Sequence, residues 1–235
     1  MSALPLSLPL SEVLLRPDVW RGDRLAVAEV AGSGFATLDA ELPGGGWPRG
    51  ALVELLQAGR GVGELSLLLP ALRACAADAP IAIVAPPGLL HAPGWAAALP
   101  LSRLLVVRAA KEDIAWSAEL LLGCGGLGAL LVWLPASVDG KSLRRLQLAA
   151  EGRRSLAFLF RPLTSARSAS PAQLRLQLTG KLQGLQVDIL KRRGPACGRS
   201  LMLAVERPVL RERVWTRERE SVRAAAAPRL VVVPR

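Results

Sequence analysis

The chain has 235 residues, of which 51% are hydrophobic and 21% charged, and its formal net charge is +11. This length suits one domain with short extensions, and the apolar content excludes a disordered chain. The cationic excess favours contact with nucleic acid or with an acidic protein partner, although an Ala-, Leu- and Arg-rich composition also produces such a charge without that role.

Short apolar runs alternate with helical stretches through the middle of the chain. A short helix is expected at 11–19, in an N-terminal arm that covers 1–31, and a turn-rich segment at 34–50 leads into the regular pattern. Continuous apolar strands that alternate with helices indicate a mostly parallel sheet covered on both faces. We expect strands at 51–56, 81–85, 104–107, 129–134 and 156–160, and helices at 64–77, 94–99, 113–122 and 141–150.

The pattern changes after residue 160. A Ser-, Ala- and Arg-rich loop at 162–171 precedes three consecutive strands, as in an antiparallel extension of the sheet. The core therefore spans 32–206, and 207–235 forms a basic C-terminal segment that ends as a tail. The three strands are expected at 173–178, 185–191 and 201–205.

No segment has the pattern of a membrane span or a signal peptide. The apolar runs at 65–72 and 126–134 are shorter than the roughly 18 to 20 residues that a span needs. The apolar N-terminus lacks a basic region and is interrupted by Pro5 and Pro9. We expect a cytoplasmic protein with no membrane segment.

The cysteines and the histidine do not have the spacing of a metal site. Cys75, Cys124 and Cys197 lie far apart in apolar or Gly-rich surroundings, so we interpret them as buried free thiols. His91, in a Pro-flanked loop, is expected to have a structural or surface role, and Asp139 is expected to cap a helix. We expect no metal and no cofactor.

A Gly-rich loop, GRGVGELS at 59–66, lies between an expected strand and an expected helix, where a phosphate-binding loop would lie. Such a loop needs a lysine for the outer phosphates and a hydroxyl group for magnesium, but those positions hold Glu64 and Leu65. A carboxylate here would repel phosphate by about 1 kcal/mol or more. We therefore interpret the segment as a phosphate-binding loop that has lost its phosphate- and magnesium-binding side chains. Its glycines are Gly59, Gly61 and Gly63.

Three segments resemble the RecA recombinase family: GFATLD at 34–39, PGGGWPRG at 43–50, and the Val-Glu pair at 53–54 before the loop. The chain from about 32 to 205 follows that family's core without large gaps. More narrowly, the chain is similar to the ImuA family, RecA-like proteins of bacterial damage-inducible mutagenesis operons. Members of that family share PGGGWPRG, GVGEL and a late LKRRGP segment, here 190–195.

The resemblance locates further losses in the ATPase site. After the second core strand the RecA family has a catalytic glutamate, where this chain has Pro86 and Pro87. At the end of the fourth strand the family has a magnesium-linked aspartate, where this chain has Trp133. The resemblance therefore implies a RecA-like core with a degenerate ATPase site, and a protein that is not an enzyme.

The resemblance also suggests where nucleic acid would bind. The loop at 162–171 corresponds to the mobile DNA-binding loop of RecA-like proteins, although it has no aromatic residue for base stacking and is equally consistent with a plain surface loop. A second basic cluster flanks an expected turn and is equally consistent with a solvated rim. The possible DNA contacts are Arg161, Arg167, Lys191, Arg192 and Arg193.

The segment 207–223 can form an amphipathic helix whose apolar side contacts a partner protein or packs on its own core. The possible partner contacts are Leu210, Val214 and Trp215.

The ImuA resemblance implies a non-catalytic accessory protein of translesion DNA synthesis in the SOS response. The implied partners are ImuB, an inactive relative of Y-family polymerases, and an error-prone C-family polymerase; RecA, non-specific DNA and a second copy of the chain are further candidates. The alternative is a division inhibitor similar to SulA, which binds FtsZ. SulA chains are shorter and lack a long basic tail, so the segment after residue 205 favours ImuA. A third hypothesis is an active RecA-like ATPase, and the loss of the ATPase residues argues against it.

Overall fold

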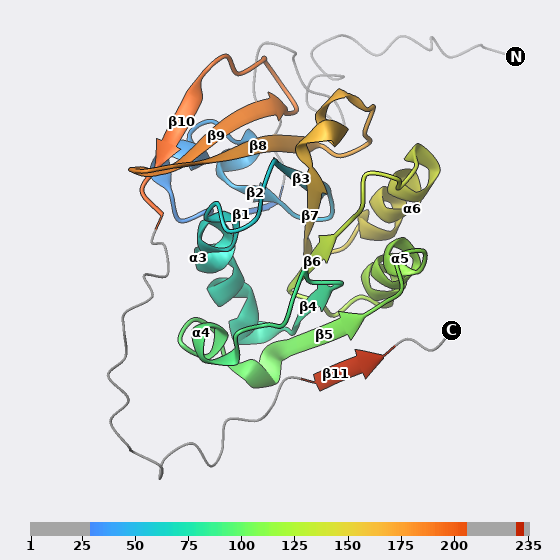
Figure 1. Cartoon of the computed structure of the whole chain (residues 1–235). Coiled ribbons are helices and arrows are strands. Elements are labelled where there is room, and N and C mark those ends of the chain that lie inside the picture. The colour runs from blue at the N-terminus through green and yellow to red at the C-terminus, as the bar shows by residue number, and fades with distance from the viewer. Residues whose placement is uncertain (1–28, 206–228, 233–235) are drawn as a thin grey trace, which may run out of the picture.

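The computed structural model describes residues 29–205 and 229–232 (Figure 1). The expected helix at 11–19 and the candidate partner contacts Leu210, Val214 and Trp215 lie outside the described residues. The strands of the main sheet are β3 (Leu52–Gln57), β4 (Ile81–Val84), β5 (Leu104–Arg108), β6 (Ala129–Trp133), β7 (Leu156–Pro162), β8 (Leu174–Lys181), β9 (Gly184–Lys191), β10 (Ser200–Leu203) and β11 (Arg229–Val232).

Within the described residues these strands form one nine-stranded sheet in the order β10-β9-β8-β3-β7-β6-β4-β5-β11. All neighbouring pairs from β8 to β11 are parallel, whereas β9 pairs antiparallel with both β8 and β10. The expectation of an α/β fold, with a mostly parallel sheet that continues into antiparallel strands, is confirmed. A separate two-stranded sheet joins β1 (Val30–Ala31) to β2 (Trp47–Pro48).

Strand β3 lies inside the sheet, between β7 and β8. Its residue Val53 pairs with Phe158 of β7 and with Leu174 of β8, and all three side chains are buried. Both faces of the strand are covered, which is why its sequence is a continuous apolar run and not an alternation. The expected central position of this strand is confirmed.

The helices form a layer on each side of the sheet (Figure 1). Helices α3 (Glu64–Asp78) and α4 (Ala92–Ala96) pack on one face, where Leu67 and Trp95 join the core with Val53. Helices α5 (Ile114–Cys124) and α6 (Gly140–Ala150) pack on the other face, where Leu143 joins a second core with Leu52. A short helix, α2 (Ala36–Asp39), precedes the sheet.

The connections leave the carboxyl ends of the parallel strands in two directions. After β3 and β4 the chain passes to the face covered by α3 and α4, whereas after β6 it passes to the face covered by α6. Where neighbouring connections diverge in this way, open α/β sheets have a crevice that receives ligands. The Gly-rich loop lies at this edge.

Two elements differ from the expectation. Residues 229–232, expected to belong to a C-terminal tail, form strand β11, which pairs in parallel with β5 through Leu230 and Val106. The helix expected at 94–99 is the short helix α4 (Ala92–Ala96), which begins and ends earlier than expected. His91 caps it, because its Nδ1 accepts a hydrogen bond from the Gly94 N–H at 3.2 Å. His91, expected to have a structural or surface role, is exposed and caps this helix. Within the described ranges no helix is long and apolar enough to cross a membrane.

Candidate functional site

The Gly-rich loop joins the carboxyl end of β3 to the first turn of α3, as expected. Gly61 and Gly63 have φ angles of 70° and 109°, in the left-handed region that favours glycine. This backbone turns N–H groups toward the helix N-terminus, the usual arrangement of an anion-binding loop.

The carboxylate of Glu64 occupies this anion-binding turn. Its Oε1 accepts a hydrogen bond from the Gly61 N–H at 3.1 Å, and its Oε2 accepts one from the Gly63 N–H at 3.1 Å. The side chain is buried, and a negative charge is favourable at this end of α3. The sequence predicted that Glu64 would repel phosphate; in the structure Glu64 also takes the N–H groups that a phosphate would need.

Leu65, the next residue, is half-buried and packs against the core. Gly59 is exposed, and the space where a Cβ would lie is open. The loop therefore keeps the backbone of an anion-binding turn, but its first helical residues supply a carboxylate and an apolar side chain.

Trp133, at the end of β6, stacks on Phe160 of the neighbouring strand β7, with ring centroids 4.3 Å apart and planes inclined by 10°. The indole Nε1 of Trp133 is buried and has no hydrogen-bond partner. An aromatic pair thus fills the place where the RecA resemblance puts an acidic residue, and an indole offers no ligand to magnesium.

The loop after β4 approaches the Gly-rich loop. Arg60 donates a hydrogen bond from Nη1 to the Pro87 carbonyl at 3.1 Å, so the two loops are joined across the carboxyl edge of the sheet. Ala85, at the start of the β4 loop, has a φ of 49° and is the one non-glycine residue with positive φ within 29–205. Such a backbone is strained, and strain of this kind clusters at functional sites.

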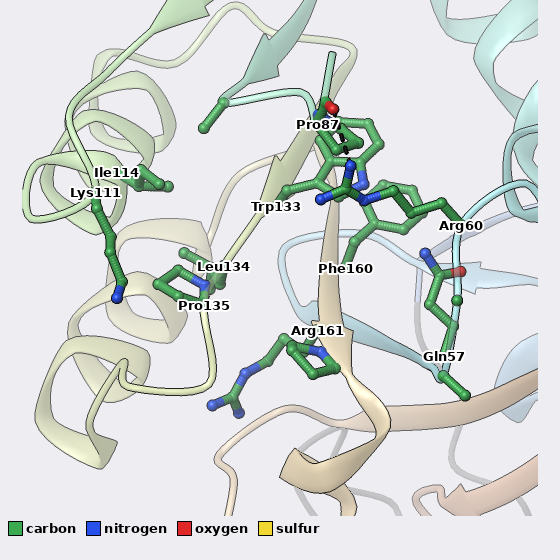
Figure 2. Close-up of a pocket in the computed structure, with 14 residues that line it drawn as sticks. Gln57, Arg60, Pro87, Lys111, Ile114, Trp133, Leu134, Pro135, Phe160 and Arg161 are labelled. Atoms are coloured by element: carbon green, nitrogen blue, oxygen red, sulfur yellow. Dashed lines mark hydrogen bonds between the residues drawn. The ribbon is translucent and has the colours of Figure 1, made fainter.

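A crevice of about 430 Å³ opens between these loops (Figure 2). Its walls come from the ends of β3, β6 and β7, from the β4 loop and from the start of α5. Figure 2 shows Lys111 on one side of the space, with Arg60 and Arg161 on other sides. Gly59 and Arg60 of the Gly-rich loop also line the crevice, whereas Gly61, Gly63 and Glu64 of the amide turn do not.

A buried ion cluster shares Arg161 with the crevice lining, and sequence reasoning missed it. Glu54 is fully buried in β3, and its two carboxylate oxygens accept bonds from Arg161 Nη1 at 3.2 Å and from Arg175 Nε at 2.7 Å. The Ser170 hydroxyl donates a third bond to this carboxylate at 2.6 Å. Sequence gives no local signal for the cluster, because its members are distant in the chain.

The cluster fixes the loop expected to contact DNA. Arg175 donates from Nη1 and Nη2 to the carbonyls of Ala166 and Ser165, in a 3-10 helix at Leu163–Arg167. Arg161, expected as a possible DNA contact, is buried in β7, where its guanidinium is paired with Glu54. Arg167 is exposed at the end of the 3-10 helix, as expected.

The second basic cluster is also engaged within the fold. Lys191 donates from Nζ to the Ser170 carbonyl at 2.8 Å, and partial burial lowers its pKa. Arg192 Nη1 lies 2.9 Å from Glu41 Oε2, and this bond lowers the pKa of Glu41. Arg193 is half-buried and has contacts of its own. Lys191 and Arg192 thus bond to other parts of the fold, although Lys191 stays exposed.

The cysteines differ in exposure. Cys75 is buried, and that burial raises the pKa of its thiol; Cys197 is half-buried. Cys124 is exposed at the end of α5, so the expectation of a buried thiol is wrong there, because the helix ends at the surface. Asp139 caps α6 as expected, since its Oδ1 accepts from the Ser142 N–H at 2.9 Å. Within the described residues no cluster of three His, Cys, Asp or Glu is placed to hold a metal.

Comparison with known proteins gives no family: no protein-family model matches the chain, and no curated protein matches it significantly.

Proposed function

We propose that this chain is a RecA-like, non-catalytic accessory protein of damage-induced translesion DNA synthesis, which acts through contacts with ImuB and an error-prone C-family polymerase. The proposal rests on the PGGGWPRG, GVGEL and LKRRGP segments and on an α/β fold in which the GVGEL loop follows a central strand. On this proposal the core at 32–206 is RecA-like, and nucleotide chemistry has been lost.

The observation that carries the non-catalytic part is the position of Glu64. Its carboxylate accepts the Gly61 and Gly63 N–H groups. Phosphoryl transfer needs a cation, a magnesium-holding group and a group that orients water, all around the same phosphate. By the resemblance, Glu64 takes the place of the cation, Leu65 and Trp133 take the places of the magnesium-holding groups, and Pro86 and Pro87 take the place of the group that orients water. A protein of this kind acts by binding, and its partners supply the chemistry.

The test has a binding arm and a genetic arm. The full chain is mixed with ImuB from the same genome, and co-purification is expected at equimolar ratio. Deletion of the gene is expected to lower damage-induced mutation to the level of an ImuB deletion, with no further loss in the double deletion. A normal mutation frequency in the deletion strain would contradict the role. Filamentous cells on overproduction, with FtsZ captured in place of ImuB, would support the division-inhibitor alternative.

A further inference from the structure

Helix α5 has the composition of a buried helix, although one of its sides is exposed. Glu119 is the only charged residue in its sequence, IAWSAELLLGC, whereas a surface helix normally carries charged residues along its outer face. On α5 the outer face has Trp116 and Leu120, which are 50% and 53% exposed. Gly123 and Cys124, at the end of the helix, are also exposed. A helix that is apolar all round is usually covered on all sides, so this face has the pattern of a contact surface.

Trp116 and Leu120 form one apolar stripe. They are four residues apart in the helix, so their side chains lie one above the other on the same face. The neighbouring helix α6 lies beside α5 and contacts it through an ion pair, with Arg145 Nη2 2.8 Å from Glu119 Oε2 (Figure 1). This contact occupies Glu119 and leaves the stripe exposed. Tryptophan with an aliphatic neighbour is typical of the centre of a protein interface.

The two ends of α5 have opposite charges. The exposed Glu112 and the half-buried Asp113 precede its first residue. At the other end the exposed Arg153 donates from Nη2 to the Gly123 carbonyl at 2.8 Å. Lys111, next to Glu112 in the chain, lines the crevice at the carboxyl edge of the sheet (Figure 2). The apolar stripe therefore lies between an acidic end and a basic end.

Such a face is complementary to a second copy of itself. When two α5 helices pack antiparallel about a twofold axis level with Ala118, Trp116 faces the partner's Leu120, because each is two residues from Ala118. The same arrangement brings the acidic end of each helix to the basic end of the other, so that Glu112 meets the partner's Arg153. A twofold axis makes every such contact twice, as a self-complementary interface requires. The antiparallel direction also opposes the two helix dipoles.

An anionic ligand fits this face less well than a second copy does. Nucleic acid is held through its phosphates by cations, and the stripe itself has none. The exposed cations Lys141 and Arg144 lie on α6, and Arg167 and Lys191 lie at the 3-10 helix and at β9. A segment of another protein would need one basic and one acidic end around an apolar centre. A second copy meets that condition by symmetry.

We propose that the outer face of α5 is the contact surface of a symmetric homodimer. In this dimer Trp116 packs against the partner's Leu120, and Glu112 pairs with the partner's Arg153. The proposal goes beyond the proposed function and does not depend on it.

The test is sedimentation equilibrium of the full chain at low ionic strength over a wide range of protein concentration, where the wild type is expected to dimerise. Trp116→Ser combined with Leu120→Ser is expected to raise the dimer dissociation constant roughly a hundredfold or more, because each dimer loses both apolar contacts twice. Glu112→Arg and Arg153→Glu, each alone, are expected to raise it about tenfold, because like charges then meet at two places in each dimer.

An equal mixture of the Glu112→Arg and Arg153→Glu proteins is expected to recover the wild-type affinity. In the mixed dimer an arginine at 112 faces a glutamate at 153, and the native Glu112 faces the native Arg153, so both pairs again have opposite charges. Arg144→Glu, a charge reversal on the exposed side of α6, is the control and is expected to leave the dissociation constant unchanged. Far-UV circular dichroism of each variant verifies that it is folded.

A chain that is monomeric at every concentration would overturn the proposal. A dimer that survives the Trp116 and Leu120 changes would also overturn it, because another surface would then hold the two copies together. So would a mixture of the two charge variants that dimerises no better than either protein alone. The accessory role is judged separately: a monomeric chain that still captures ImuB would remove this contact surface and leave that role in place.

Discussion

The Oε1 atom of Glu64 lies 3.1 Å from the backbone nitrogen of Gly61, three residues earlier in the chain. The helix thus folds its own first carboxylate back into the turn that precedes it. A phosphate in this turn would have to displace an anion that is already held, buried and favourably placed at a helix N-terminus. Glu64 accepts the N–H groups of the loop, so the loop can keep its shape, including the glycines with positive φ, without a bound nucleotide.

Replacement of Glu64 by alanine is expected to empty the amide turn. The variant loses two charge-assisted bonds, at a cost of about 1–3 kcal/mol in the free energy of unfolding. Tens of millimolar phosphate are expected to raise the Tm of Glu64→Ala and to leave the Tm of the wild type almost unchanged. Leu65→Ala, next to it in the helix, serves as the control. An equal rise in the wild type would contradict this account of the turn.

Restoring a lysine at this position is not expected to restore ATP turnover. Glu64→Lys removes the internal anion, but Leu65 still offers no oxygen to magnesium, and Trp133 cannot replace an acid. Calorimetric titration with magnesium-ATP and a phosphate-release assay, with and without single-stranded DNA, measure the outcome. We expect no micromolar affinity in the wild type and no release above the blank in either protein. DNA-stimulated release would reveal an ATPase site built from other residues.

The Glu54 cluster is expected to be essential for folding stability. Glu54→Gln leaves Arg161 and Arg175 buried without their carboxylate, at a cost of about 3–5 kcal/mol. Replacing all three by apolar residues, as Glu54→Leu with Arg161→Met and Arg175→Met, removes the unpaired charges and is expected to recover much of that loss. Urea unfolding of the variants measures both effects. A cost below about 1 kcal/mol for Glu54→Gln would show that the guanidinium groups find other partners.

The cysteines are expected to react with a thiol reagent in the order of their exposure. Cys124 should react rapidly in the native protein, Cys197 more slowly, and Cys75 only on unfolding, because burial protects its thiol and raises its pKa. Titration with a chromogenic disulfide gives the rates, and Cys124→Ser should remove the fast phase alone. A fast phase that survives this change would place another thiol at the surface.

The Glu41 pair with Arg192 is expected to make stability pH-dependent at the acidic end. The hydrogen bond from Arg192 holds the pKa of Glu41 below its ordinary value of 4.5, so the folded state favours the ionised form. The resulting stability is present above the unfolded pKa and is lost as pH falls through the folded pKa. The stability difference between wild type and Glu41→Gln should therefore be largest near pH 7 and shrink below about pH 4. Glu119→Gln, which breaks a pair with the exposed Arg145, is the control and should have a smaller effect.

The sequence predicted correctly those elements that depend on a few neighbouring residues. The run from Leu52 to Gln57, the Gly-rich loop and the helix that begins at Glu64 were all expected close to their observed positions, because apolar runs and glycines act over a few residues. Strand β11 was missed for the converse reason. It is a short apolar run like the other strands, but it lies outside the alternating series of strands and helices, and its pairing with β5 joins residues far apart in the chain.

The candidate site was predicted in part. The chemistry of Glu64 followed from its position, but its bonds to Gly61 and Gly63 depend on backbone geometry that a motif does not carry. Glu54 meets Arg161 and Arg175 across 107 and 121 residues of sequence, so no spacing rule could join them. The basic residues were read as free cations for DNA because charge is visible in sequence and pairing is not.

Strand β11 can join the sheet only at a late stage of synthesis of the chain. Its partner β5 leaves the ribosome first, and everything between Arg108 and Arg229 must be synthesised before the pair can form. At a synthesis rate of roughly 5–20 residues per second, the outer edge of β5 therefore stays open on the order of 10 s. An open strand edge is a template for pairing with other chains. During that interval, chaperones and neighbouring nascent chains can bind the open edge of β5 in competition with β11.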